Sequence, residues 1–173
     1  MASLKREIAQ QQPFSSIGEE ALLNLMRTSD AVQRAFHLRT REWGVTSTQY
    51  NVLRILRGAQ PDGLTCAAIG ARMITAEPDV TRLLRRLKTL RLIRQQRDQR
   101  DRRMVWTQIS AAGLELLSAM DPVIEKLPEE LLGHMSPAEL SELIRLLERA
   151  RRSDESGQPL RCDGSREEEI PKN

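Results

Sequence analysis

The chain has 173 residues, of which 29% are charged and 3% aromatic, and its formal net charge is +3. This length suits one domain with a core and a tail, and the few aromatic residues leave Leu, Ile, Val, Met and Ala to build that core. Two distant cysteines, Cys66 and Cys162, exclude a disulfide framework and a cysteine-based metal site. With neither a bilayer-spanning apolar run nor a signal-peptide core, we expect a soluble, cytoplasmic protein.

The charge is distributed unevenly along the chain. Residues 54–103 hold thirteen Lys or Arg against five Asp or Glu, a net of +8, whereas residues 111–152 and 153–173 each sum to −3. A basic middle between neutral or acidic ends indicates a polyanion-binding module on a scaffold that does not bind polyanions.

The N-terminal part predicts a flexible arm followed by a long helix. Residues 1–17 are polar and contain the helix breaker Pro13, which favours a weakly ordered arm. A helix is predicted from about Glu19 to Glu42, and Gly44 ends it. Its apolar positions are Leu22, Leu23, Met26, Val32, Ala35 and Phe36.

Two further helices follow, separated by the turn cluster AQPDG at 59–63. The first is capped by Thr46, Ser47 or Thr48 and ends at Gly58, and its apolar face is Val45, Val52, Leu53 and Leu56. The second is short and is capped by Thr65, with Ile69 and Met73 pointing inward.

The next helix, within residues 75–93, is strongly amphipathic. Thr75 is the expected N-cap, with Glu77, Pro78 and Asp79 in the first turn. Apolar residues recur at helical spacing at Val80, Leu83, Leu84, Leu87 and Leu90. The other face carries Thr81, Arg82, Arg85 and Lys88, with Arg86 and Arg91 at its flanks. Such a face fits the DNA major groove, although the segment alone equally suits a solvated surface helix.

Residues 92–110 predict a β-hairpin with a basic tip. The segment starts with Leu92 and Ile93 and ends with alternating Val105, Thr107 and Ile109, while RQQRDQRDRR between them is too polar for a core. Arginines on a thin loop can enter the minor groove, and an Asp at the tip can orient an Arg by a bidentate pair. The tip arginines are Arg97, Arg100, Arg102 and Arg103, and the acids are Asp98 and Asp101.

The last part is again helical. Ser110 caps one segment, which Pro122 and Pro128 are expected to kink or split. Ser136 opens a second with a capping box, and its apolar stripe is Leu140, Leu143, Ile144 and Leu147. The acidic tail, residues 153–173, is expected to be disordered.

Taken in order, these elements resemble the MarR family of bacterial winged-helix transcription regulators over about residues 19–152. VTSTQYNVLRIL resembles the family's second helix and LTCAAIGARM its third. VTRLLRRLKTLRLIRQ resembles the recognition helix with the first wing strand, and DRRMVWTQISAAG resembles the wing signature. One departure is Arg91, which stands where the family usually has Gly.

The resemblance implies a mainly α fold with a small β-hairpin wing: a winged helix-turn-helix DNA-binding lobe (45–110) and a helical dimerisation lobe (18–44 and 111–152). It implies a homodimer with recognition helices in successive major grooves and wings in the flanking minor grooves. Base or phosphate contacts fall to Pro78, Asp79, Thr81, Arg82, Arg85 and Arg86, and phosphate donors are Thr46, Ser47, Thr48 and Thr65. Asp101 and Arg103 form the implied wing pair, with Arg100 or Arg102 near the tip.

Many members of this family bind small anionic aromatics between the two lobes, which implies an effector ligand here. The candidate lining residues are Phe36, His37, Arg39, Trp43 and Tyr50, although Phe36 and Trp43 also suit a core and His37 a solvated surface. Cys66 stands at a helix start, where the dipole lowers a thiol pKa, and offers oxidant sensing as an alternative; the ordinary interpretation of Cys66 is a small buried helix residue. We predict no metal and no cofactor.

An enzyme is disfavoured because the sequence has no nucleotide-binding glycine loop, metal cluster or nucleophile–histidine arrangement. A protein-binding winged helix would not need arginines concentrated on one side. Non-specific DNA binding remains an alternative, for which affinity would fall with salt equally on all sequences. The sequence therefore predicts a dimeric, sequence-specific repressor of transcription that a small ligand releases from a pseudo-palindromic operator.

Overall fold

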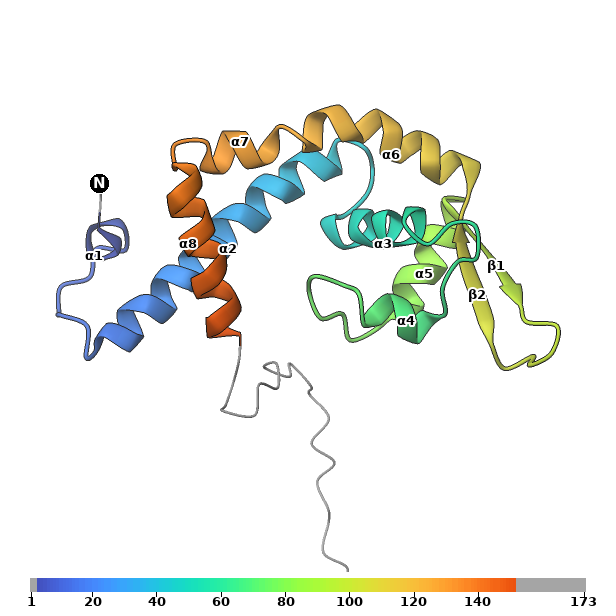
Figure 1. Cartoon of the computed structure of the whole chain (residues 1–173), viewed down its shortest axis with the longest axis horizontal. Helices are drawn as coiled ribbons and strands as arrows, with labels where there is room; N and C mark the ends of the chain where they lie inside the picture. Colours follow the sequence, from blue (N-terminus) through green and yellow to red (C-terminus); the bar gives the residue numbers. More distant parts are fainter. Residues whose placement is uncertain (1–2, 152–173) are drawn as a thin grey trace, which may run out of the picture. The chain divides into compact units, whose positions relative to one another are not determined.

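The computed structural model describes residues 3–151, which form helices joined to one two-stranded hairpin (Figure 1). The chain divides into two compact units, Met1–Leu127 and one that begins at Pro128. The elements of the first unit are α1 (Leu4–Glu7), α2 (Ile17–Arg41), α3 (Ser47–Arg57), α4 (Cys66–Gly70), α5 (Val80–Thr89), β1 (Ile93–Arg97), β2 (Val105–Ile109) and α6 (Ala111–Ile124). Helix α7 (Leu127–Leu132) spans the division, and α8 (Pro137–Ala150) lies in the second unit.

Side-chain caps define most of the helix starts. The Ser16 hydroxyl accepts a hydrogen bond from the Glu19 N–H at the start of α2, and Thr46 forms a capping box with Gln49 at the start of α3. The Thr65 hydroxyl caps α4 by accepting a hydrogen bond from the Ala68 N–H. The cap predicted at Thr65 is therefore confirmed, and of the three candidates Thr46, Ser47 and Thr48 the structure uses Thr46. Each cap oxygen satisfies an N–H that a helix start leaves without a partner.

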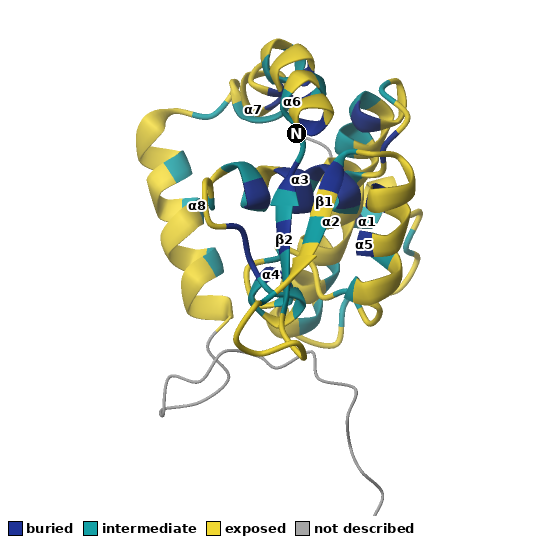
Figure 2. Cartoon of the chain, turned by 90° about the vertical axis from the view of Figure 1, so that its right-hand side faces the viewer, coloured by how far each residue is buried: buried dark blue, intermediate teal, exposed yellow. Residues whose placement is uncertain are grey.

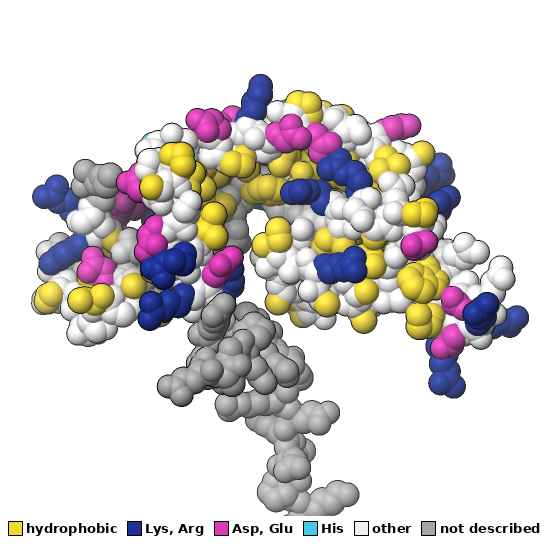
Figure 3. All heavy atoms as spheres, viewed as in Figure 1, with side chains coloured by type: hydrophobic (Ala, Val, Ile, Leu, Met, Phe, Trp, Pro, Cys, Tyr) yellow, Lys and Arg dark blue, Asp and Glu magenta, His cyan; other side chains and the backbone are white. Residues whose placement is uncertain are grey.

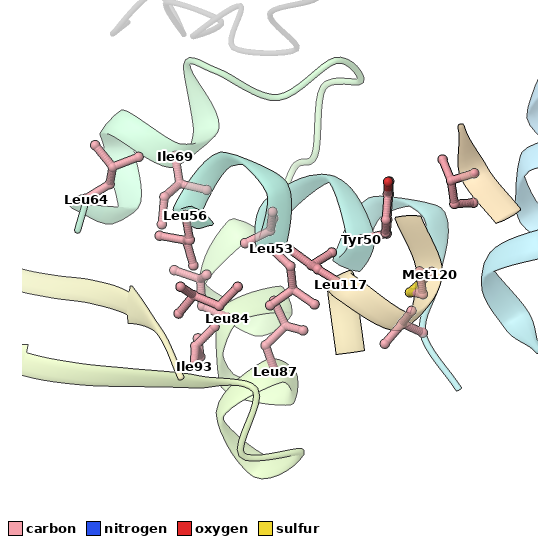
Figure 4. Packing of buried hydrophobic residues seen from close by; sticks show 14 residues of the cluster. Tyr50, Leu53, Leu56, Leu64, Ile69, Leu84, Leu87, Ile93, Leu117 and Met120 are labelled. Atoms are coloured by element: carbon pink, nitrogen blue, oxygen red, sulfur yellow. The ribbon is translucent and has the colours of Figure 1, made fainter. Parts of the chain in front are cut away.

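The core of the first unit lies among α3, α5, α6 and the hairpin. Helix α3 contributes Val52, Leu53 and Leu56, each fully buried, and α5 contributes Leu84 and Leu87. Figure 4 shows the four leucine side chains converging with those of Ile93, Leu117 and Met120. Figure 2 shows the same concentration of buried residues on α3 and the adjoining strand ends. This core fixes the exposed face of α5 with respect to the hairpin.

The predicted hairpin is confirmed: it is antiparallel, and its register pairs Ile93 with Ile109 and Arg97 with Val105. Its second strand is also tied to the segment before α4, because Leu64 and Thr107 exchange two backbone hydrogen bonds of 2.9 and 2.8 Å. Gly63 precedes this bridge with φ of +79°, and a Cβ there would lie 2.5 Å from the Thr107 carbonyl oxygen. The base of the hairpin is thus fixed by glycine-dependent backbone contact.

The two prolines of the C-terminal region have different effects. Pro122 lies within α6 without ending it. The helical structure is instead interrupted between Ile124 and Leu127, just ahead of Pro128. Pro128 has no N–H to donate to the Ile124 carbonyl four residues earlier, and its ring would clash with that carbonyl. The predicted split is therefore found at the second proline.

In the second unit, α8 begins with the predicted capping box, in which Ser136 and Glu139 exchange hydrogen bonds. The helix has no buried residue: Leu140, Leu143 and Leu147 are half-buried and Ile144 is 58% exposed. The predicted stripe therefore exists but is not covered within the described chain, as the exposed and half-buried colours of α8 show in Figure 2.

The N-terminal arm contains one helical turn that the sequence did not predict. Leu4 in α1 is buried, and the Glu7 carboxylate lies 3.7 Å from the Arg27 guanidinium on α2. The tail predicted to be disordered, 153–173, lies outside the described residues.

Candidate nucleic-acid interface

Helix α5 has one apolar side in the core and one basic side in solvent. Leu84 and Leu87 are buried, and Val80 and Leu83 are half-buried. Leu90 departs from the predicted stripe: it is 45% exposed, because the helix ends at Thr89 and no longer directs that side chain to the core. The exposed side consists of Thr81, Arg82, Arg85, Arg86 and Lys88.

The start of α5 differs from the prediction. The N-cap is Asp79, whose Oδ1 accepts a 2.8 Å hydrogen bond from the Arg82 N–H, and Thr75, Glu77 and Pro78 lie in the preceding loop. Thr75 and Asp79 both have side chains that can cap a helix. Thr75 does not do so because its segment is fixed outside the helix by Asn51, whose side chain accepts a 3.1 Å hydrogen bond from the Ile74 N–H. Asp79 and Pro78 consequently stand ahead of the basic face, next to its first turn.

Helix α4 precedes this loop and meets α5 at one polar contact. The Cys66 Sγ lies 3.7 Å from the Thr81 hydroxyl, and both belong to the first turn of their helices. The thiol is half-buried and free of disulfide bonding. Thr65 uses its oxygen as the cap of α4, accepting from the Ala68 N–H at 3.3 Å, which leaves its hydroxyl proton available for donation.

The candidate phosphate donors at the start of α3 lie beside a cavity. Thr46 Oγ1 accepts from the Gln49 N–H, and the Ser47 hydroxyl lies 3.4 Å from that of Thr40, which is buried. Thr46, Ser47 and Thr48 form the start of α3, and all three also line the cavity described below.

The wing tip is organised by hydrogen bonds to two carboxylates. Asp98 Oδ1 accepts from the N–H groups of Arg100 and Asp101 at 2.8 and 3.0 Å, and Asp98 Oδ2 accepts from the Trp106 indole N–H at 2.9 Å. These three donors lower the pKa of the Asp98 carboxyl, the Asp101 N–H most of all. The tip is therefore a folded turn.

The expected pair between Asp101 and an arginine side chain is not what the structure shows. The Asp101 carboxylate accepts a 2.9 Å hydrogen bond from the backbone N–H of Arg103, and within residues 3–151 no ion pair joins it to a guanidinium. A two-residue spacing brings the backbone donor closer than the long side chain. Figure 3 shows basic side chains gathered with acidic ones where Figure 1 places the tip. The exposed tip and strand-end arginines are Arg97, Arg100, Arg102 and Arg103.

The corner between α5 and β1 is strained, as the replacement of Gly by Arg91 predicts. Arg91 has φ of +59°, a left-handed conformation that costs a non-glycine residue on the order of 1 kcal/mol. Its carbonyl accepts a 2.7 Å hydrogen bond from the Ser110 hydroxyl, and Ser110 also caps α6. The surrounding bonds hold the corner in place.

A cavity of about 860 Å³ lies in the first unit and brings together three of the five candidate ligand residues. Phe36, His37 and Tyr50 line it, and the rings of Phe36 and Tyr50 are 5.4 Å apart. Arg39 and Trp43 do not line it; the Trp43 indole N–H is buried without an acceptor among the described residues. Sequence reasoning missed the further lining residues Asp30, Val32, Gln33, Arg34, Leu38, Asn51, Arg54, Ile74 and Thr75.

The Tyr50 hydroxyl group is held in its protonated form. Burial is the main cause that raises the pKa of Tyr50 above its ordinary value of 10.0, and the nearby Arg54 opposes it. Figure 4 shows the hydroxyl pointing away from the leucine cluster. Tyr50 can therefore donate a hydrogen bond to an anion or carbonyl at neutral pH.

Residues 3–151 contain no group of three or more His, Cys, Asp or Glu that could hold a metal ion. Within the same residues, no helix combines the length and the apolar character that crossing a membrane requires.

Comparison with known proteins identifies the fold. The sequence profile of the MarR family matches residues 43–104, and no curated protein matches the chain. The crystal structure of a MarR transcription factor from Planctomyces limnophilus is 36% identical, with a TM-score of 0.62, and the match covers 79% of this chain and 99% of that one.

Two more distant structures share the fold alone. The MepR–DNA complex from S. aureus is 22% identical, with a TM-score of 0.68 over 80% of this chain and 97% of that one. BpsR from Bordetella bronchiseptica, whose DNA binding 6-hydroxynicotinic acid regulates, is 24% identical, with a TM-score of 0.67 over 76% and 98%. With its basic helix α5, its hairpin and a 36% identical relative matched over nearly its whole length, this chain belongs to the MarR family of winged-helix DNA-binding transcription regulators.

Proposed function

We propose that the protein is a sequence-specific repressor that binds a pseudo-palindromic operator as a homodimer and leaves it when a small anionic aromatic ligand binds. The observation that carries this proposal is the division of α5 into a buried apolar side and an exposed side of Thr and Arg. In this arrangement Arg82 and Arg85 read base edges in the major groove, since Arg can donate two hydrogen bonds to guanine. Arg86 and Lys88 bind the flanking phosphates.

The hairpin supports the same mode of binding. Its base is tied to Leu64 and its tip carries exposed arginines, so it can extend the contact from the major groove to the adjacent minor groove. Thr46, Ser47, Thr48 and Thr65, at the starts of α3 and α4, donate to phosphates. Among the similar folds, MepR has been crystallised with DNA.

Dimer formation is supported by the apolar residues that α2 leaves exposed. Leu22, Leu25 and Met26 are 57%, 44% and 59% exposed on one stretch of this helix. Ile144 and Leu146 on α8 are 58% and 46% exposed. Apolar residues at this density on a soluble regulator indicate a protein interface, and a second copy of the chain would place two α5 helices on one operator.

The effector part of the proposal rests on the cavity. Phe36, Tyr50 and Ile74 supply apolar and aromatic surface, while His37 and Arg54 supply groups that can face an anion. Ile74 and Thr75 belong to the loop that leads into α5, so a ligand that contacts them acts on the position of the recognition helix. A ligand that prefers the conformer not bound to DNA then releases DNA by linkage.

A footprint of the protein on the DNA upstream of its own gene, with excess random competitor, tests the function. We expect a protected inverted repeat with half-sites about one helical turn apart, roughly 34–36 Å. Protection that disappears with competitor, together with equal affinity for all duplexes across a salt titration, would establish non-specific binding instead.

The effector is tested on the same footprint with hydroxybenzoates as probes. We expect them to remove the protection at millimolar concentration, and the Tyr50→Phe variant, which loses only the hydroxyl, to need about tenfold more probe. Protection that persists through the whole probe series would remove the small anionic aromatics from the proposal while leaving the operator untouched.

A further inference from the structure

The wing tip is built around the carboxylate of Asp98, one of the two acids that the sequence places at the tip. It accepts three hydrogen bonds, from the backbone N–H groups of Arg100 and Asp101 and from the indole N–H of Trp106 on the opposite strand. Two backbone hydrogen bonds close the turn beneath it: the Asp98 N–H donates to Met104 and the Met104 N–H donates to Asp101, at 3.0 and 2.9 Å. The carboxylate and these two backbone bonds together order the turn from residue 98 to residue 104.

The other end of the wing is held independently. The Gln108 side chain donates to the Pro61 carbonyl at 2.7 Å and accepts at 3.0 Å from the Arg94 guanidinium on β1. Together with the bridge between Leu64 and Thr107, these bonds attach the wing to the segment before α4. With the base fixed to the lobe, the geometry of the tip alone decides where its arginines lie with respect to α5.

The charge of Asp98 does not cancel the charge of those arginines. Its hydrogen bonds go to backbone and indole N–H groups, and within the described residues no hydrogen bond or ion pair engages the side chains of Arg100, Arg102 and Arg103. The carboxylate thus orders the backbone and leaves the three guanidinium groups available for a ligand. An acid that served only as a charge would be unfavourable beside DNA phosphates.

We propose that Asp98, locked by Trp106, is a positioning residue that holds Arg100 and Arg102 at the height and angle needed to enter the minor groove. This inference rests on the proposed DNA-binding function and deepens it. The backbone N–H of Arg100 itself donates to the Asp98 carboxylate. Arg102 lies between Asp101, whose N–H donates to Asp98, and Arg103, whose N–H donates to Asp101. Without the carboxylate, the same arginines occupy many positions, and binding must first restrict them.

The direction of the effect separates positioning from simple electrostatics. Removing an acid near DNA should strengthen binding, and we expect this of the matched control, Asp62→Ala. The Asp62 carboxylate is exposed beside the wing base, and within residues 3–151 the only hydrogen bond that Asp62 makes to a side chain is through its backbone carbonyl, which accepts from Gln108. We expect Asp98→Ala to weaken binding about tenfold and Trp106→Phe, which loses only the indole N–H, about threefold. Asp98→Asn keeps one acceptor oxygen and should restore part of the loss.

A double-mutant cycle tests whether Asp98 acts through the arginines. In an Arg100→Ala/Arg102→Ala background, Asp98→Ala should cause no further loss, because the groups that it positions are gone. Equal losses in both backgrounds, or tighter binding by Asp98→Ala, would overturn the inference. The cycle is measured on operator and on random duplex, because the wing is expected to contact any duplex. If the unmodified protein shows no preference for the operator, the proposed sequence-specific function fails, while the role of Asp98 is still tested on random duplex.

A readout without DNA completes the test. In the Trp43→Phe protein Trp106 is the remaining tryptophan, and its indole N–H signal reports the bond to Asp98. We expect slow hydrogen exchange at this N–H and a clear acceleration in Asp98→Ala at unchanged thermal stability of the lobe. Fast exchange in both proteins would show that the tip is not held by this carboxylate.

Discussion

Helices α2 and α3 are neighbours in the chain, yet they are built for different surroundings. Helix α3 has 11 residues, of which five are buried, whereas α2 has 25 residues with only Thr40 buried. Both helices carry apolar residues at helical spacing. The difference shows that an apolar stripe identifies a surface to be covered without saying what covers it: α3 is covered by this chain, and we propose that most of α2 is covered by a second copy.

The largest effect should come from emptying the covered core. Leu87→Ala removes a fully buried side chain from α5 and should lower the free energy of unfolding by about 2–5 kcal/mol. Leu90→Ala, one turn later on the same stretch and 45% exposed, is the matched control and should cost under about 1 kcal/mol. Urea denaturation checks both; similar losses would mean that the lobe is not packed as described.

The next effect concerns the uncovered face of α2. Met26→Asp places a charge among Leu22, Leu25 and Met26 and should weaken dimerisation at least about tenfold, since burying one such side chain is worth roughly 1.5–3 kcal/mol. Analytical ultracentrifugation measures the shift. Thr28→Asp introduces the same charge at an exposed polar position and should leave the dimer unchanged. A protein that is monomeric before any substitution would contradict the proposed role of α2.

A smaller gain is expected at the corner after α5. Arg91→Gly removes a side chain from a left-handed conformation and should raise the free energy of unfolding by up to about 1 kcal/mol. Arg91→Ala keeps a Cβ at the same φ, so it should give no comparable gain, and it controls for the lost charge. Thermal unfolding of the two variants distinguishes backbone strain from charge repulsion.

The smallest effect is a pH dependence of the capping box at the start of α8. Hydrogen bonds from the Ser136 N–H and then its hydroxyl lower the pKa of the Glu139 carboxyl below its ordinary value of 4.5. A lowered folded-state pKa means that the capping box stabilises α8 above pH 4.5 and loses this contribution as the pH falls through the lowered value. Circular dichroism should show fraying of α8 only when the pH falls below 4.5. The Glu139→Gln variant keeps the box and should lose this titration.

The sequence predicted well wherever local chemistry decides. Thr46, Thr65, Ser110 and Ser136 are caps because each has the right side chain just ahead of a helical pattern, and the period of two before Ser110 gave the second wing strand. The MarR-family resemblance, carried by four short stretches, was confirmed by the relative from Planctomyces limnophilus.

The misses are places where distant residues decide. Thr75 and Asp79 are both good caps, and the choice depends on a hydrogen bond from Ile74 to Asn51, on another helix. The use of Asp98 depends on hairpin register, which pairs Trp106 with Gln96 and so brings the Trp106 indole N–H within 2.9 Å of the Asp98 carboxylate. Asp101 is the exception: its partner is the backbone N–H of Arg103, only two residues away, so a local turn competed with the predicted ion pair. No local pattern contains the other two contacts.

The central claim is that α5 reads base sequence, and one comparison of affinities tests it most directly. The measurement is the ratio of operator to random-duplex affinity for the unmodified protein, for Arg85→Ala, and for Arg149→Ala, which removes the same charge from α8. We predict that Arg85→Ala loses about 1–3 kcal/mol on the operator and far less on random duplex, while Arg149→Ala changes neither. Equal losses on both duplexes for Arg85→Ala would contradict base reading by α5.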